Sequence, residues 1–222
     1  MKVCTDSCLF GAWLSEKIKN LPVQPINALD IGSGTGLLSL MLAQKVNTFI
    51  DAIEIEVEAA QQATENIKAS PWKNSIQVQA VSLQNFSPGI KYDLIFSNPP
   101  FFYNELKSDN QQKNNAKHET TLTLDVMVQF IVQHLSPDGQ AALLLPFHRT
   151  ADFEKMAQEK GLFVTQRVLI KQTPGHQYFR SILLLSGIQK KNISEESICM
   201  YDDQKKYTEA FSSLLKDYYL LL

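Results

Sequence analysis

The fold is decided by the stretch Ile26-Asn27-Ala28-Leu29-Asp30-Ile31-Gly32-Ser33-Gly34-Thr35-Gly36, a short apolar strand that runs directly into a glycine loop. Apolar residues then recur at helical spacing over residues 37–46, so the order strand, loop, helix is expected. This order points backbone N–H groups and the positive end of a helix at a ligand. The glycines let that ligand approach the backbone closely, because no Cβ intervenes.

The spacing of the glycines narrows the class of ligand. The dinucleotide fingerprint Gly-x-Gly-x-x-Gly is absent in either register, and the lysine of a P-loop is also missing. Instead, Asp30 ends the strand ahead of Gly32, Gly34 and Gly36. A carboxylate at this place suits a ligand that carries an ammonium or sulfonium charge better than a pyrophosphate. The pattern therefore indicates S-adenosylmethionine.

A second expected strand, residues 49–55, carries an acidic residue near its end, about twenty positions after the glycines. In nucleoside-binding α/β sheets an acid at this place reaches the ribose hydroxyls. Glu54 is the first choice for this role and Glu56 the second. The alternative for Glu56 and Glu58 is the acidic first turn of the following helix.

A further motif, Asn98-Pro99-Pro100-Phe101, follows a fourth expected strand at residues 92–96. Consecutive prolines restrict the backbone and hold Asn98 and Pro99 nearly rigid. Two acceptors are thereby fixed, the side-chain oxygen of Asn98 and the carbonyl of Pro99, beside the ring of Phe101. The alternative is a rigid turn that only closes the strand.

This set of groups suits the chemistry of a planar amine. The lone pair of an aromatic amino group is delocalised into its ring, so the nitrogen is a poor nucleophile. Two acceptors that grip its N–H bonds help it become pyramidal and aim the lone pair at an electrophile. No strong base is needed beforehand, since the proton is acidic once a fourth bond has formed.

Strands alternate with helices along the chain, which predicts a doubly wound α/β fold with its ligand at the carboxyl ends of the central strands. The expected strands are residues 26–31, 49–55, 75–81, 92–96, 140–145, 162–170 and 180–185. The expected helices are residues 9–21, 37–46, 57–69, 122–135, 151–160 and 207–220. Residues 102–118 are polar and read as a lid, a substrate clamp or a disordered connection.

Length and composition indicate one globular domain over residues 1–222. We divide it into a cap segment (1–25), a catalytic core (26–187) and a C-terminal extension (188–222). The chain has no apolar signal core and no run of 18 apolar residues, and its three cysteines fit no disulfide or metal pattern, so we expect a soluble cytoplasmic protein without a metal.

The formal charge of −2 does not indicate a nucleic-acid binder, but the charge is unevenly distributed. Residues 160–191 contain six Lys or Arg residues and no Asp or Glu. Such a segment can form a local positive face. The alternative is that these are solvated ends of strands and a helix.

Together, the glycine loop with Asp30, the acid at residue 54 and Asn98-Pro99-Pro100-Phe101 resemble class I S-adenosylmethionine-dependent methyltransferases that act on amino nitrogens. Within these, the chain is similar to the tRNA adenine-N(6) methyltransferases that modify the adenosine 3′ to the anticodon of valine tRNA. The closer similarity is carried by Met1-Lys2-Val3-Cys4-Thr5-Asp6, Phe10-Gly11-Ala12-Trp13, Ala116-Lys117-His118-Glu119, Lys206-Tyr207-Thr208 and Asp217-Tyr218-Tyr219-Leu220.

The resemblance implies a mostly parallel, seven-stranded, Rossmann-like sheet whose last strand is antiparallel, in a monomer that acts on the tRNA anticodon loop. It implies that Asp30 and the glycine loop hold the methionine part of the cofactor, that Glu54 holds the ribose and that Ser82 and Leu83 hold the adenine. It also implies these further roles: Lys2, Thr5 and Asp6 help close the cofactor site, Asn98, Pro99, Pro100 and Phe101 form the catalytic motif, and Lys117 and His118 contact the RNA.

Two departures from the family pattern matter. Ser82 stands where the family usually has an acid, so we expect adenine binding to depend on backbone groups and to be weaker. The family also carries a basic and aromatic segment before the position of Met1, so we expect the natural chain to start upstream and RNA binding by the 222-residue chain to be impaired.

Three rival functions stay open on the sequence. Protein glutamine methyltransferases that act on release factors use the same Asn-Pro-Pro-aromatic motif, because a side-chain amide also presents a planar NH₂. A non-catalytic module that binds an adenosine ligand is the second rival. An NAD-dependent oxidoreductase is the third, and the glycine spacing disfavours it.

Overall fold

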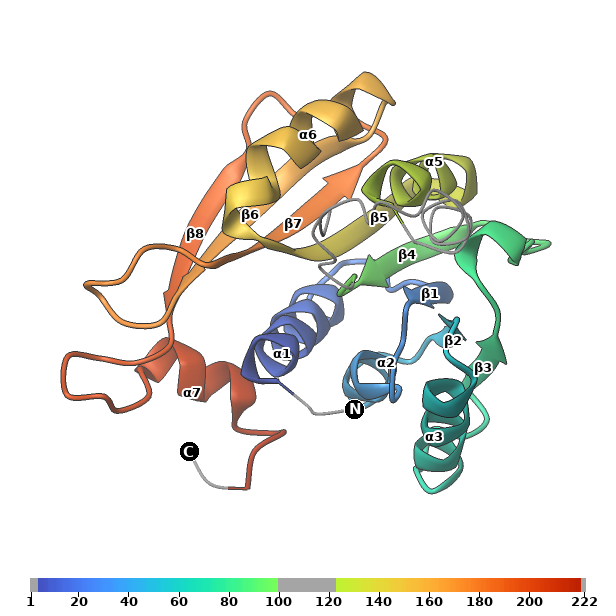
Figure 1. Ribbon diagram of the computed structural model, residues 1–222, viewed down its shortest axis with the longest axis horizontal. Helices are drawn as coiled ribbons and strands as arrows, with labels where there is room; N and C mark the ends of the chain where they lie inside the picture. The colour runs from blue at the N-terminus through green and yellow to red at the C-terminus, as the bar shows by residue number, and fades with distance from the viewer. Residues whose placement is uncertain (1–3, 100–122, 221–222) are drawn as a thin grey trace, which may run out of the picture.

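One mixed β-sheet runs through the computed structural model, which describes residues 4–99 and 123–220, with helices on both faces of the sheet (Figure 1). The strands are β1 (Asn27–Ile31), β2 (Phe49–Glu54), β3 (Ile76–Ala80), β4 (Tyr92–Ser97), β5 (Leu135–Pro146), β6 (Phe163–Lys171), β7 (Arg180–Ser186) and β8 (Ser194–Cys199). The helices are α1 (Thr5–Lys19), α2 (Leu37–Ala43), α3 (Val57–Lys68), α5 (Leu124–His134), α6 (Thr150–Glu159) and α7 (Glu209–Leu215), with short 3₁₀ turns η1 (Leu83–Asn85) and η2 (Phe147–Arg149).

The strand order is β3-β2-β1-β4-β5-β7-β6-β8. Strands β1 to β5 are parallel to one another, and β7 runs antiparallel to both of its neighbours, β5 and β6. The predicted α/β class with a mostly parallel sheet is confirmed.

The predicted number of strands is wrong, because the described sheet has eight strands and not seven. The added strand, β8, pairs in parallel with β6, so the antiparallel strand is the seventh and not the last. The sequence did not reveal β8 because an edge strand can expose its polar side chains to water, and residues 194–197 are all exposed. Strand β5 also begins earlier than expected, at Leu135, through an irregular register beside Tyr92 and Leu94.

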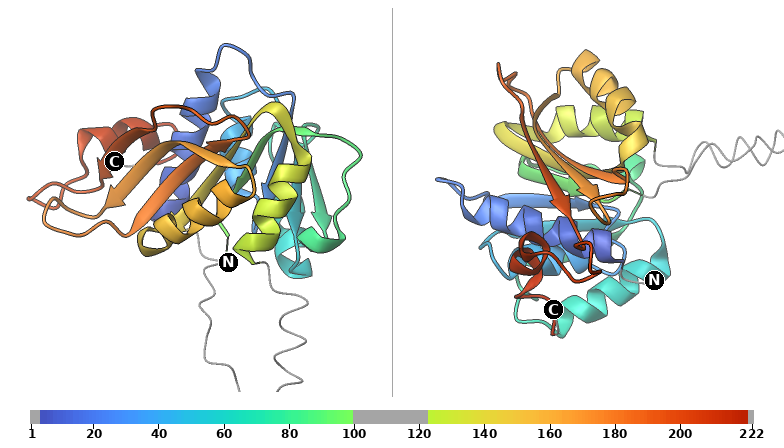
Figure 2. Two further views of the ribbon diagram at one scale, coloured as in Figure 1. Left: turned by 90° about the horizontal axis from the view of Figure 1, so that it is seen from above. Right: turned by 90° about the vertical axis from the view of Figure 1, so that its left-hand side faces the viewer.

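The two faces of the sheet carry separate helical layers (Figure 2). Helices α1, α2 and α3 lie on one face and α5 and α6 on the other (Figures 1 and 2). In β4, Phe96 belongs to the core cluster under α1 and α2, whereas Ile95 belongs to the cluster under α5. Both are fully buried, as expected for a central strand that is covered on both faces.

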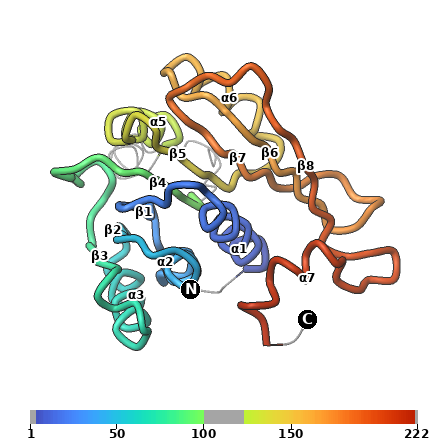
Figure 3. Tube along the Cα trace, turned by 180° about the vertical axis from the view of Figure 1, so that it is seen from behind, coloured from blue at the N-terminus to red at the C-terminus, as the bar shows by residue number. Residues whose placement is uncertain are grey.

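The C-terminal segment packs onto the first helix. Figure 3 shows α7 beside α1, below the end of β8. Phe211 of α7 is fully buried in the same core cluster as Leu9 and Phe10 of α1. Helix α7 therefore shares a hydrophobic core with α1, the first helix of the chain.

The register of β1 and β4 brings the two sequence motifs together. Asp30 is paired with Phe96, and Ser97 Oγ donates a hydrogen bond of 2.7 Å to the carbonyl of Ile31. Gly32 and Asn98 are thus the next residues of two adjacent strands, whose axes lie about 4.8 Å apart. The glycine loop and the Asn-Pro-Pro motif therefore begin side by side at the carboxyl ends of the parallel strands, which we call the carboxyl edge of the sheet.

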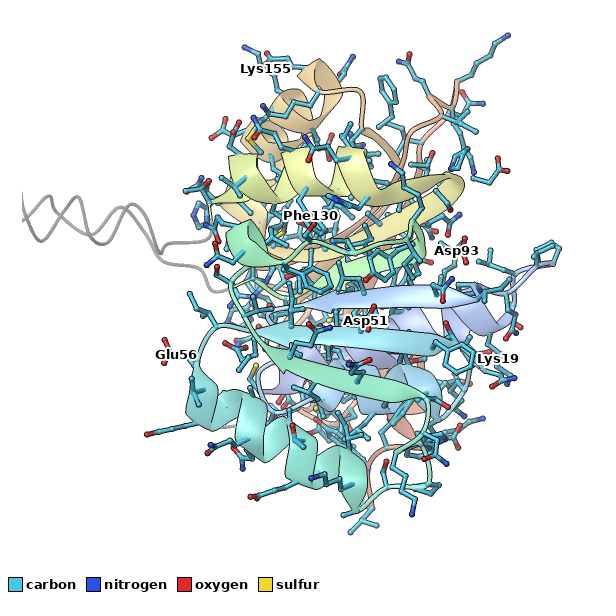
Figure 4. The ribbon with its side chains drawn as sticks, turned by 90° about the vertical axis from the view of Figure 1, so that its right-hand side faces the viewer. Lys19, Asp51, Glu56, Asp93, Phe130 and Lys155 are labelled. Carbon is cyan, nitrogen blue, oxygen red and sulfur yellow. The ribbon has the colours of Figure 1, made fainter. Side chains whose placement is uncertain are left out.

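At the opposite edge, formed by the amino ends of the parallel strands, the side chain of Asp93 connects three strands. Its Oδ2 accepts from the backbone N–H groups of Ile26 (2.9 Å) and Asn27 (3.2 Å), and its Oδ1 accepts from Ser136 Oγ (3.0 Å). Figure 4 shows Asp93 and Lys19 at this edge and Glu56 at the other. One carboxylate therefore joins the starts of β1 and β5 to β4.

Within the described ranges, no helix has the length and apolar character needed to cross a membrane.

Candidate active site

The glycine loop adopts a conformation that other residues disfavour. Gly32, Gly34 and Gly36 have φ angles of 71°, 56° and 80°, and the N–H groups of Gly32 and Ser33 both donate to the carbonyl of Ile53. A Cβ built on Gly32 would meet nothing within 4 Å, so the loop leaves open space there. A ligand can approach the backbone on that side.

Glu54, the first choice for the ribose, fixes this loop from the neighbouring strand. Its Oε2 accepts from the N–H of Gly34 (2.8 Å) and its Oε1 accepts from the N–H of Glu56 (3.0 Å). Its side chain is buried, whereas that of Glu56 is exposed. The carboxylate of Glu54 therefore lies at the glycine loop, and its position favours it over Glu56.

Asp30 is fully buried under the same loop. Its Oδ2 accepts from Ser39 Oγ (2.7 Å), and its Oδ1 has no hydrogen-bond partner among the described residues. Burial raises the pKa of this carboxyl to about 7, against the hydrogen bonds from Ser39, and the charge of Glu54 raises it further. A cationic ligand at Oδ1 would stabilise the ionised form.

Asn98 is oriented by helix α1. Its Nδ2 donates a hydrogen bond of 2.6 Å to Ser7 Oγ, while its Oδ1 is buried and has no partner in the described parts of the chain. Ser7 Oγ is also 2.9 Å from Cys4 Sγ. The NH₂ group of the amide is thus bound to the protein, and its oxygen is available to accept a hydrogen bond from a ligand.

The first turn of α1 is held at the site by an ion pair. Asp6 Oδ2 accepts from Arg180 Nε at 2.8 Å, and Asp6 Oδ1 accepts from the N–H of Ser7. Burial alone would raise the pKa of Asp6, but hydrogen bonds from Cys4 and Arg180 bring it below its ordinary value. Thr5 is the first residue of the helix, and its side chain partly offsets the effect of burial, which raises the pKa of Tyr219 to about 12.

Ser82 and Leu83 lie just past the carboxyl end of β3. Ser82 precedes η1, and its carbonyl accepts from the N–H groups of Asn85 and Phe86. The N–H of Val81 donates to the carbonyl of Glu54, which ties this turn to the end of β2. Both residues are therefore at the same edge of the sheet as the glycine loop.

Buried acceptors without partners gather at this edge. Buried polar groups are almost always hydrogen-bonded, so each exception needs an explanation. In the described residues there are four such side-chain atoms, and three of them belong to Asp30, Ser33 and Asn98. A ligand with an ammonium group at Asp30 and a hydrogen-bond donor at Asn98 would satisfy two of these atoms, so the residues present fit the expected cofactor and substrate.

The structure brings together nine of the sequence-predicted positions at the carboxyl edge of β1 to β4: Thr5, Asp6, Asp30, Gly32, Gly34, Gly36, Glu54, Ser82 and Leu83. Two further predicted residues, Asn98 and Pro99, lie beside these nine at the end of β4. Lys2, Pro100, Phe101, Lys117 and His118 lie outside the described residues.

Three contacts of the site were missed by sequence reasoning. They are made by Ser7 to Asn98, by Arg180 to Asp6 and by Ser39 to Asp30. The first two join positions that are 91 and 174 residues apart, and no local pattern reports such a pair. Ser39 lies in the helix after the glycine loop, nine residues from Asp30, and its polar side chain on an otherwise apolar helix was the available signal.

Residues 13–145 match the methyltransferase small domain family. Together with the strand order, the glycine loop and the acceptors at the sheet edge, this match defines the class: a class I methyltransferase, whose cofactor is S-adenosyl-L-methionine. The chain is 37% identical over 223 residues to the tRNA1(Val) (adenine(37)-N6)-methyltransferase of Parabacteroides distasonis, covering 99% of this chain and 91% of that protein. The protein of the same name from Pectobacterium carotovorum is 37% identical over 227 residues, covering 100% and 88%. The chain belongs to this family of tRNA1(Val) (adenine(37)-N6)-methyltransferases.

Solved structures show the same fold at low sequence identity. A predicted O-methyltransferase from Agrobacterium tumefaciens superposes with a TM-score of 0.71 at 14% identity, over 95% of each chain. The N-methyltransferase NodS from Bradyrhizobium japonicum superposes with a TM-score of 0.56 at 16% identity, over 78% of this chain and 92% of that one.

Proposed function

We propose that the protein transfers a methyl group from S-adenosyl-L-methionine to the exocyclic N6 of an adenine in tRNA, the adenosine 3′ to the anticodon of valine tRNA. It acts as a cytoplasmic monomer on the anticodon loop. The family relationship supports the reaction and the tRNA substrate, since the relatives are named for this activity. The site residues support it by their chemistry.

The observation that carries the proposal is the unpartnered Oδ1 of Asn98 at the end of β4, beside the glycine loop that follows β1. An exocyclic amine has two N–H donors, and acceptors that bind these N–H groups leave its lone pair free to attack the methyl group. The amide oxygen of Asn98 and the carbonyl of Pro99 are of this kind. Because neither is a strong base, they orient the amine without first removing its proton.

The residues around the loop divide the binding of the cofactor between them. Asp30 receives the ammonium group, Glu54 presents the ribose subsite while it holds Gly34, and Ser82 and Leu83 border the adenine. S-adenosyl-L-methionine supplies an electrophilic methyl group on a sulfonium centre. Holding the amine in attack geometry can remove on the order of 7–11 kcal/mol from the barrier. An anticodon-loop base is largely unpaired, so turning it toward Asn98 costs little.

The substitution Asn98→Ala tests the proposal. We expect methyl transfer to tRNA to be abolished while the affinity for S-adenosyl-L-methionine, measured by calorimetry, stays close to that of the wild type. Asn20→Ala, at the far end of α1, is the matched control and keeps full activity. Loss of cofactor affinity in Asn98→Ala, or normal turnover, contradicts the role of Asn98.

The substrate is tested in the same assay with labelled cofactor. Total tRNA and a release factor are offered in parallel to the wild-type protein, and the modified tRNA is digested and analysed by mass spectrometry. We expect label on N6-methyladenosine from valine tRNA. Label on release-factor glutamine would favour a glutamine methyltransferase, and cofactor binding without label in either would favour a binding module.

A further inference from the structure

Two segments of the chain meet beside the active site, at the same edge of the sheet. η2 follows β5 directly, and the turn of residues 172–179 joins β6 to β7. Because β7 is antiparallel to β5, its first residue, Arg180, pairs with the last residue of β5, Pro146. The N–H of Phe147 donates to the carbonyl of Phe179, which fastens the two segments together.

The side chains of these segments combine rings and cations. We name as the aromatic-basic rim the six residues Phe147, His148, Arg149, Lys171, His176 and Tyr178. The rings of Phe147 and Tyr178 are 5.4 Å apart between centroids and tilted by 52°. Lys171 Nζ lies 5.8 Å from the centroid of the Tyr178 ring. Phe147, His148, Arg149 and His176 are exposed, so the rim presents aromatic and basic side chains to solvent.

A short series of contacts links the rim to the catalytic amide. Arg180 follows the rim in sequence and pairs with Asp6, and the next residue, Ser7, accepts from Asn98. The rim and Asn98 are therefore joined through the first turn of α1. A polymer whose target group reaches Asn98 has its neighbouring units within reach of the rim.

The charges near the rim favour an anionic partner. Residues 160–191 contain no Asp or Glu. Among the described acids on adjoining elements, Asp6 pairs with Arg180, and Asp202 accepts through its Oδ1 from the N–H groups of Gln204 and Lys206 in its own loop. Asp152 is exposed in the first turn of α6, after η2. Within the described parts of the chain, neither Arg149 nor Lys171 forms an ion pair with a carboxylate.

We infer that the aromatic-basic rim binds the RNA nucleotides that flank the target adenine. This inference rests on the proposed function. A base that turns into an active site leaves its neighbours without a stacking partner, and exposed rings beside cations are the usual replacement for single-stranded RNA. Lys171 and Arg149 meet the phosphates, and Phe147 and Tyr178 meet a base.

The test compares two double variants with the wild-type protein. Phe147→Ala/Lys171→Ala removes one ring and one cation from the rim. Phe49→Ala/Lys73→Ala removes an exposed ring and an exposed cation from the opposite edge of the sheet and is the matched control. The dissociation constant for unmodified valine tRNA is measured at several salt concentrations, together with that for S-adenosyl-L-methionine and the melting temperature.

We expect the rim variant to bind tRNA about tenfold more weakly or worse, because one stacked base is lost. The slope of its salt dependence should fall by about one, because one phosphate contact is lost. Its cofactor affinity and its turnover at saturating tRNA stay at the wild-type level, and the control variant matches the wild type throughout. Lys171→Glu, which leaves every ring in place, should also weaken tRNA binding and so guards against a folding effect.

Equal tRNA affinity in the rim variants, the control variant and the wild type would overturn the inference. That result is distinct from failure of the proposed function, which appears as a wild-type protein that methylates no tRNA. The binding measurement needs no methyl transfer, so the two outcomes are read separately.

Discussion

Ser7 is the residue whose contact most directly sets the orientation of the proposed catalytic amide. It accepts from Asn98 Nδ2 and thereby keeps Oδ1 directed away from the protein's own donors. We predict that Ser7→Ala lowers kcat about 10- to 100-fold, because small displacements of an orienting group are costly to attack geometry. The KM for S-adenosyl-L-methionine should stay within about twofold of the wild type. Steady-state kinetics on tRNA check both values.

The matched control for Ser7 is Ser15→Ala. Ser15 is also a buried serine of α1, but its Oγ donates to the carbonyl of Gly11 and does not contact Asn98. Its substitution should leave kcat unchanged. If both variants lose activity equally, the effect of Ser7 comes from the helix and not from the amide.

Asp30 should make the stability of the cofactor-free protein depend on pH. The pKa of its carboxyl is raised from 3.8 to about 7 in the folded protein, first through burial. The folded state therefore holds this proton over a pH range in which the unfolded chain has released it, and stability falls as pH rises from about 4 to about 7. A shift of this size corresponds to about 4 kcal/mol.

Asp30→Asn removes this titration. We predict a variant that is more stable than the wild type at pH 8, that loses the fall in stability between pH 5 and pH 7, and that no longer binds S-adenosyl-L-methionine. Urea unfolding at a series of pH values and calorimetric titration of the cofactor provide the measurements. An unchanged pH profile would show that Asp30 is already ionised in the free protein.

At the scale of elements, the glycine loop needs glycine for two reasons. Its backbone has positive φ angles, and its ligand needs the space that a Cβ would fill. Gly32 and Gly161 both have positive φ, 71° and 82°, and a Cβ on either would meet nothing within 4 Å. Gly32→Ala and Gly161→Ala should therefore lower the free energy of unfolding by similar amounts, about 1–2 kcal/mol. Gly32→Ala alone should weaken cofactor binding, because only its Cβ enters the proposed ligand space.

Thermal unfolding and cofactor titration of the two variants settle the comparison. Loss of cofactor affinity in Gly161→Ala, which lies at the end of α6, would mean that global destabilisation explains both results. Gly36→Ala is expected to be destabilising by a similar amount, since its φ of 80° is also positive and its Cβ would make only ordinary contacts with Ala63 and Ile67 at 3.4 Å.

The sequence predicted those elements whose signal is local. Strands β1 to β4 and the glycine loop combine apolar runs with glycine or proline boundaries, and they lie within a few residues of the expected ranges. The sequence did not reveal β8, because its exposed Ser and Glu residues do not alternate with apolar ones. The motifs of the site were found in the same way, whereas Ser7 and Arg180 take their places only through tertiary packing.

At the scale of the whole molecule, we predict that residues 188–222 unfold together with the rest of the chain. Phe211 of α7 is fully buried and stacks on Tyr207 with centroids 4.6 Å apart. Trp13 of α1 donates to Glu196 of β8 at 2.9 Å. Phe211→Ala should cost about 3–5 kcal/mol of stability in a single transition.

Circular dichroism and tryptophan fluorescence, the latter in a Trp72→Phe background so that Trp13 is the reporter, should give coincident unfolding curves. Phe49→Ala, at an exposed phenylalanine, should change stability by less than about 0.5 kcal/mol. Two separate transitions in Phe211→Ala would mean that the C-terminal residues form an independent unit.

The hydrogen bonds of Asp93 with Ile26, Asn27 and Ser136 have a consequence for how the substrate of such a protein can change during evolution. Three strands are aligned by one side chain at the edge remote from the cofactor, so the alignment makes no demand on the loops that choose a substrate. Mutation and selection can then exchange those loops, and with them the nucleic acid or protein that is modified, while the scaffold keeps its register. Substitutions that change the substrate and residues that maintain the alignment of the strands therefore lie at opposite ends of the same strands.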